Sequence, residues 1–131
     1  MNILDHNFPE NQLTSLRNRR IRFQKIGRDI GRPAWEDWQE IRRLLHQLKQ
    51  PTFFTRDNDF YHPKYRHSGY CIVFLDVPVL QSADGVSRFL RHPDFRTKRQ
   101  RMGKVVRVSS SRLSYWEIQR DAEKIVEWVV P

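Results

Sequence analysis

Residues 52–60 read Thr52-Phe53-Phe54-Thr55-Arg56-Asp57-Asn58-Asp59-Phe60, a short apolar run followed at once by two aspartates. A run of this length without polar alternation is typical of a strand buried on both faces, as in parallel sheets covered by helices. Open α/β sheets bind their ligands at the carboxyl ends of the strands. The stretch therefore predicts an interior strand that carries acidic side chains where such sheets form their sites.

A second aspartate follows a strand-like run near the start of the chain. The stretch Ile3-Leu4-Asp5-His6-Asn7-Phe8-Pro9 places Asp5 directly after the apolar residues of a predicted strand over residues 2–4. Pro9 is well placed for the first turn of the helix that we expect next. Asp5 and Asp57 thus have the same expected position, at the exit of a strand.

The rest of the chain alternates strand-like and helix-like segments. The clearest helix is marked by a stripe of apolar residues at three- and four-residue spacing from Trp35 to Leu48. We expect helices over residues 9–19, 35–48 and 82–91, strands over residues 2–4, 21–26, 52–55, 70–77, 105–109 and 113–118, and a helical or irregular end over residues 121–130. This alternation predicts a single α/β domain over residues 1–131, a three-layer α/β/α sandwich with a mostly parallel central sheet.

The expected strand order brings the aspartates together. In the common order 2-1-3-4-5 the first and third strands are neighbours, and the ligand crevice opens between them. Asp5 ends the first strand and Asp57 ends the third. Convergent carboxylates suit Mg²⁺ or Mn²⁺, which prefer oxygen ligands. We therefore expect Asp5, Asp57 and Asp59 to bind a metal ion, with Asp37 completing the catalytic set from the start of the second helix.

Each of these aspartates also has a purely structural interpretation. Asp5 could cap the first helix and Asp57 could cap the turn that begins at Asn58. Asp37 could serve only to complement a helix dipole. Asp76, at the end of the predicted central strand, is a weaker candidate because Pro78 after it is typical of an ordinary strand exit.

The charge of the chain favours a polyanionic partner. The formal net charge is +9 and the sequence pI is about 10.3, which favours nucleic acid or an acidic protein. Residues 60–67 interleave aromatic side chains with basic ones, as protein sites for single-stranded RNA do. The alternative is that these aromatic rings pack on the core. The basic residues expected to contact RNA are Lys64, Arg66, Arg96, Lys98, Arg99 and Arg101, and for residues 96–101 a solvated helix face is the alternative.

Composition narrows the class of protein. No apolar stretch approaches the roughly 20 residues of a membrane helix, and the N-terminus does not resemble a secretory signal. Cys71 is the only cysteine, which excludes an intramolecular disulfide and a multi-cysteine zinc site. We expect a cytoplasmic protein without a membrane partner.

Two motifs resemble those of the short PIN-like domains of prokaryotic toxin–antitoxin operons, relatives of the VapC ribonuclease toxins. Residues 4–9 are similar to the family's Leu-Asp-Glu-Asn-Leu-Pro, and residues 55–60 to its Thr-Arg-Asp-x-Asp-Phe. The likeness covers about residues 1–80, with a loose match at residues 37–41. It implies a PIN-like fold, Mg²⁺- or Mn²⁺-dependent endoribonuclease activity, and an acidic or DNA-binding antitoxin as partner; a homodimer stays open.

His6 departs from this pattern, because the family usually has glutamate there. The change removes one carboxylate from the predicted site, so a catalytically degenerate module that binds nucleic acid or protein is the second hypothesis. A receiver domain, which also places aspartates after its first and third strands, is a third. Receivers need a lysine at the end of the fifth strand, where this chain has Arg107-Val108-Ser109.

Overall fold

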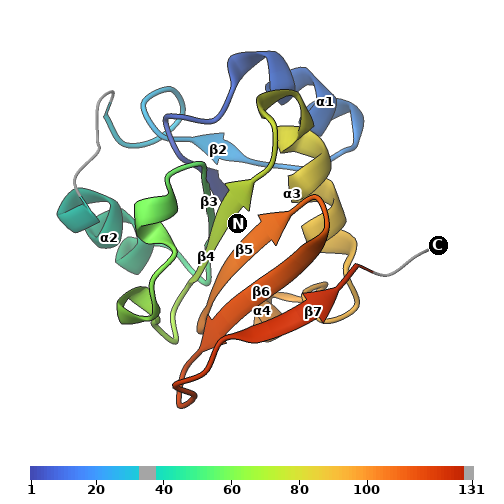
Figure 1. Ribbon diagram of the computed structural model, residues 1–131. Coiled ribbons are helices and arrows are strands. Elements are labelled where there is room, and N and C mark those ends of the chain that lie inside the picture. Colours follow the sequence, from blue (N-terminus) through green and yellow to red (C-terminus); the bar gives the residue numbers. More distant parts are fainter. Residues whose placement is uncertain (33–37, 129–131) are drawn as a thin grey trace.

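The computed structural model describes residues 1–32 and 38–128, and in this part of the chain seven strands form one sheet (Figure 1). The strands are β1 (Asn2–Leu4), β2 (Gln24–Lys25), β3 (Thr52–Thr55), β4 (Cys71–Asp76), β5 (Lys104–Ser109), β6 (Arg112–Glu117) and β7 (Lys124–Glu127). The helices are α1 (Leu13–Asn18), α2 (Trp38–Gln47), α3 (Ser82–Arg91) and α4 (Lys98–Arg101).

The sheet has the order β2-β1-β3-β4-β5-β6-β7. Strands β1 to β5 pair in parallel, so the predicted order of the first five strands is confirmed. Strands β6 and β7 are antiparallel to their neighbours. The sheet is therefore mixed, and the prediction of a mostly parallel sheet was wrong at this edge, where two successive hairpins extend the sheet.

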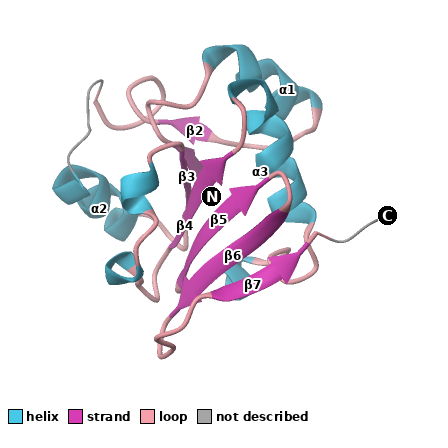
Figure 2. Ribbon diagram, viewed as in Figure 1, coloured by secondary structure: helices cyan, strands magenta, loops and turns pink. Residues whose placement is uncertain are grey.

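Helices cover both faces of the sheet (Figure 2). Neighbouring strand residues such as Phe53 and Phe54 point to opposite faces and belong to two separate apolar cores. One core includes Leu13 and Leu16 of α1 and Phe89 of α3. The other core includes the buried residues of α2: Ile41, Leu44 and Leu45. The sequence stripe that predicted α2 is thus its buried face.

Three segments differ from the sequence-based expectation. One is residues 98–101, where α4 forms although no helix was predicted. The strand predicted over residues 21–26 is reduced to Gln24–Lys25, because the chain before it is not paired with β1. The end of the chain, predicted as helical or irregular, contains β7, which pairs with β6 through Lys124–Glu127. Trp35 and Asp37, predicted to start the second helix, lie outside the described residues.

Candidate functional site

A cleft of about 370 Å³ opens at the carboxyl ends of β1 and β3. Its lining comprises Asp5, His6, Asn7, Asp57 and Phe60. The parallel pairing of β1 with β3 places the exits of both strands at the same edge of the sheet, and the backbone N–H of Asp5 continues this pairing by donating to the Phe54 carbonyl at 2.8 Å. Asp5 and Asp57 therefore share one cleft, although they lie far apart in the sequence.

Asp5 is buried and firmly held. Its side chain is among the most deeply buried polar groups, with an exposed residue fraction of 1%. Oδ1 accepts a hydrogen bond from the His6 backbone N–H at 2.8 Å and lies 3.0 Å from His6 Nδ1. Oδ2 accepts a 2.7 Å hydrogen bond from the Thr55 hydroxyl. Asp5 thus uses its carboxylate to join β1 to β3 and does not cap the first helix.

Thr55 links the two aspartates through one hydroxyl group. Besides donating to Asp5, its Oγ1 accepts from the Asp57 backbone N–H at 3.1 Å. Asn7 makes a second link, because its Oδ1 accepts from the Arg56 backbone N–H at 3.2 Å. Sequence analysis did not single out either residue, although both lie inside the quoted motifs, two positions after Asp5 and two before Asp57.

Asp57 does cap the following turn. Its Oδ1 accepts from the Asp59 backbone N–H at 3.0 Å, at the start of the 3-10 turn Asn58–Phe60. Asp57 is half-buried and lines the cleft as well, so the capping role and a position in the site coexist. Asp59 is exposed and is not among the residues that line the cleft. Asp76 is outside the cleft, where its carboxylate accepts from the Arg107 guanidinium.

The atoms of the cleft that could bind a metal ion are mainly oxygens. Each carboxylate oxygen accepts up to two hydrogen bonds, so Asp5 Oδ2, with its bond from Thr55, retains a lone pair. Asn7 Oδ1 similarly accepts one hydrogen bond, from the Arg56 backbone N–H, and retains a lone pair. Among the described residues no group of three or more histidine, cysteine, aspartate and glutamate side chains is arranged to hold a metal ion. Two carboxylates with an amide oxygen nonetheless suit Mg²⁺, which commonly binds one or two carboxylates and keeps several waters.

Arg101 and Arg66, both predicted to contact RNA, donate hydrogen bonds within the fold. Arg101 is buried; its Nε donates to Thr52 Oγ1 at 3.0 Å, and its Nη1 donates to the carbonyls of Phe95 and Arg96. Arg66 donates from Nη1 to the carbonyls of Glu117 and Arg120. Both side chains thus have partners within the protein. The sequence of a basic run does not show which of its arginines will donate hydrogen bonds to buried groups of the same protein.

The other four predicted RNA contacts lie on the surface. Lys64, Arg96, Lys98 and Arg99 are exposed. Lys64 Nζ lies 5.0 Å from the centre of the Tyr65 ring, and Arg96 donates to the Arg91 carbonyl at 3.3 Å. These residues do not gather around the cleft, whose lining includes none of them.

The aromatic loop between β3 and β4 packs on the protein. Phe60 is buried and its ring centre lies 5.8 Å from that of Phe53. The Tyr61 hydroxyl donates to the Glu123 carboxylate and also lies 2.9 Å from the Ser114 hydroxyl. The Tyr65 ring packs edge-on against Trp38. The alternative interpretation of this segment, rings that pack on the core, therefore describes these three side chains.

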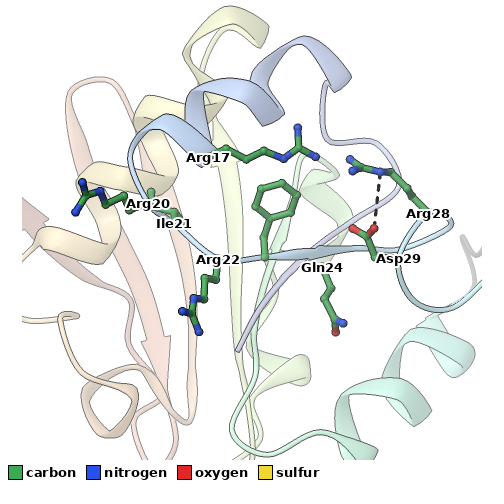
Figure 3. Close-up of a pocket in the computed structure, with 8 residues that line it drawn as sticks. Arg17, Arg20, Ile21, Arg22, Gln24, Arg28 and Asp29 are labelled. Atoms are coloured by element: carbon green, nitrogen blue, oxygen red, sulfur yellow. Dashed lines mark ion pairs between the residues drawn. The ribbon is translucent and has the colours of Figure 1, made fainter.

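A larger basic depression lies beside β2, and Figure 3 shows its lining side chains. We call it the arginine groove: a hollow of about 910 Å³ with the cationic side chains Arg17, Arg20, Arg22 and Arg28. Arg20 has a φ of 59°, a left-handed conformation typical of the residue that ends a helix. Residues 17–22 were expected to be a helix end and the start of a strand, so this groove was not predicted. The four arginines in these six positions were the signal in the sequence that could have indicated it.

Comparison of the chain with protein-family models, with curated proteins and with solved structures finds no significant match. None of the described helices has the length and apolar character needed to cross a membrane.

Proposed function

We propose that the protein is a cytoplasmic metal-dependent endoribonuclease of the PIN-like type, with Asp5 and Asp57 as its principal metal ligands. One observation carries this proposal: the two strand-end aspartates line the same cleft, on a chain with a net charge of +9. The motif resemblance of residues 4–9 and 55–60 supports the same assignment, and with it an acidic or DNA-binding antitoxin as partner.

The residues around the cleft fit an oxygen-ligated Mg²⁺ or Mn²⁺ ion. Asp5, Asp57 and Asn7 would hold it. The supporting carboxylates predicted from the sequence are Asp59, which is exposed and outside the cleft lining, and Asp37, which lies outside the described residues. When bound, such an ion supplies a Lewis acid for a phosphoryl oxygen and makes a water molecule more acidic. Thr55 keeps the Asp5 carboxylate oriented from one side and His6 from the other. Because these groups are fixed before RNA arrives, little reorganisation accompanies the reaction.

The test is RNA cleavage by the purified protein with Mn²⁺, compared with Asp57→Asn and Asp5→Asn. We expect each variant to lose at least about 100-fold in rate, on the scale of removing one electrostatic contact to the transition state. Asp94→Asn, an exposed aspartate in the loop after α3, is the matched control for lost charge and should cleave normally. Cleavage that survives both cleft substitutions would refute the assignment.

His6→Glu is a complementary gain-of-function variant. It restores the carboxylate that the resembled family has at this position, beside an aspartate that is already buried. Without a metal ion the two carboxylates repel each other, and with one they share its charge. We expect Mn²⁺ to raise the melting temperature of His6→Glu more than that of the wild type, and cleavage to become faster.

A non-catalytic binding module is the second candidate function. Both carboxylate oxygens of Asp5 already accept hydrogen bonds, and no ligand group of three is present among the described residues. A cleft whose buried carboxylate already has protein hydrogen-bond partners can serve simply to connect β1 with β3. RNA binding by the wild type without cleavage under any divalent ion would favour this function.

A further inference from the structure

The arginine groove concentrates positive charge at one edge of the sheet. It lies between the end of α1, the edge strand β2 and the turn after β2. Arg17 and Arg28 extend toward one another across it from opposite sides (Figure 3). The acidic residue in its lining is Asp29, which lies 3.7 Å from Arg28 Nε and also accepts from the Lys25 backbone N–H at 2.9 Å. The lining thus contains four guanidinium groups and one carboxylate, and that carboxylate lies beside Arg28.

A second carboxylate that feels the charges of Arg17 and Arg28, that of Glu10, is already paired with Lys25. Glu10 Oε1 accepts a 2.6 Å hydrogen bond from Lys25 Nζ. This bond lowers the pKa of Glu10, and the charges of Lys25, Arg28 and Arg17 lower it further. The electrostatic effect of Arg17 and Arg28 therefore reaches beyond the groove, and an anion placed between them gains from both charges.

The groove continues into a second one. A hollow of about 400 Å³ shares Arg22, Phe23 and Gln24 with the arginine groove and adds Lys98 to the cations. Cations are thus spaced along two adjoining grooves and do not surround one point. Such a row matches the repeating charges of a nucleic acid backbone better than a single small anion.

We propose that the arginine groove binds the phosphates of single-stranded RNA. Arg17 and Arg28 contact one segment of the RNA backbone, and Arg22 and Lys98 contact the next segment. The identity of the strand as RNA rests on the proposed ribonuclease function. Phe23 offers an apolar ring in the same lining, with the Arg17 guanidinium carbon 5.5 Å from its centre; rings and guanidinium planes are the surfaces on which unpaired bases stack. Guanidinium groups suit phosphates because they bond them in a bidentate way.

An acidic peptide is the competing occupant, and the fold favours RNA over it. A peptide would gain most by adding a strand to the edge of the sheet. The edge strand β2 consists of two residues, Gln24–Lys25, which gives such a peptide few backbone partners. The arginine side chains, by contrast, need no strand geometry to reach phosphates.

The test is the affinity for a labelled 12-nucleotide oligouridine, measured by fluorescence anisotropy with EDTA present. We expect the double variant Arg17→Gln/Arg28→Gln to bind at least about 10-fold more weakly. Its plot of log affinity against log salt should lose about 1.4 in slope, since each phosphate contact with a single strand contributes about 0.7. Arg91→Gln/Arg112→Gln removes the same charge from two exposed arginines outside both grooves and should keep most of the affinity and slope.

Three outcomes would overturn the proposal: equal losses in the two double variants, an unchanged salt slope in Arg17→Gln/Arg28→Gln, or displacement of the RNA from the wild type by equimolar hexaglutamate. Circular dichroism of each variant confirms that the fold is retained. Because EDTA removes divalent ions, the assay is independent of cleavage. RNA binding that depends on Arg17 and Arg28, in a protein that never cleaves RNA, would support the groove and refute the ribonuclease.

Discussion

At the scale of single residues, Asp5 and Asp57 each combine a structural role with a position in the cleft. Asp57 caps a turn and lines the cleft, and Asp5 joins two strands and lines it too. Both were predicted to lie at strand exits, because each directly follows a short apolar run that is typical of a buried strand. It could not identify Thr55 or Asn7 as their links, since those hydrogen bonds depend on the register between β1 and β3.

Thr55 is the residue whose loss should disturb the site most specifically. In Thr55→Val the Asp5 Oδ2 atom loses its buried donor, and an unsatisfied buried polar group costs about 1–3 kcal/mol. We expect the free energy of unfolding to fall by that amount in urea titrations, and Thr55→Ser to recover most of it. Equal stability of Thr55→Val and the wild type would mean that the bond between Thr55 and Asp5 contributes nothing.

Arg101 provides a comparison between a buried and an exposed base in the same helix. Arg101→Met leaves Thr52 Oγ1 and two carbonyls without their donor, so we expect unfolding to become easier by about 2–4 kcal/mol. Arg99→Met, two residues earlier and exposed, should change stability by less than about 0.5 kcal/mol. Similar losses in the two variants would contradict the structural role of Arg101.

At the scale of elements, helices α1, α2 and α3 and the central strands were predictable, whereas the short helix α4 and the edges of the sheet were not. Strand β3 is fully buried, and β4 is buried except at Asp76. The sequence patterns of these strands and of the striped helix α2 are set by the cores that they face. β7 has the burial pattern of an edge strand, mostly exposed, so its sequence lacks the alternation that predicts a strand. Its pairing with β6 is a tertiary effect that local patterns do not encode.

Arg66 connects the aromatic loop to the hairpin of β6 and β7. It donates to two carbonyls at the end of β6 and the turn that follows, and lies 3.6 Å from Asp121. We expect Arg66→Ala to speed amide hydrogen exchange in residues 117–124 by about 10-fold or more, since hydrogen bonds from a charged donor contribute about 1.5–3 kcal/mol. Lys64→Ala, an exposed base in the same loop, is the control; faster exchange there to the same degree would argue against a specific clamp.

At the scale of the whole molecule, several buried acids make stability depend on pH in the alkaline range. Burial raises the pKa of the Cys71 thiol from 9.0 to about 12 and also raises the pKa values of Tyr61 and Tyr70 above 10.0. Above the ordinary pKa of each group and below its raised pKa, the folded state therefore binds more protons than the unfolded state. The corresponding stability is fully present below pH 9 and is lost as pH rises toward 12.

We expect urea midpoints to fall steadily between pH 9 and pH 11. Tyr61→Phe removes one of the titrating groups together with its bonds to Ser114 and Glu123, so it should start from a lower midpoint at pH 7 and fall less steeply above pH 10. A midpoint independent of pH up to 11 would contradict the burial of these groups.

The central claim is that Asp5 and Asp57, brought to one cleft by the pairing of β1 with β3, form the core of a site for a divalent ion. Isothermal titration with Mn²⁺ tests it most directly. We predict one site in the wild type, an affinity at least about 10-fold weaker in Asp57→Asn, and wild-type affinity in Asp94→Asn. Binding of Mn²⁺ with the same affinity by the wild type and Asp57→Asn would contradict the claim.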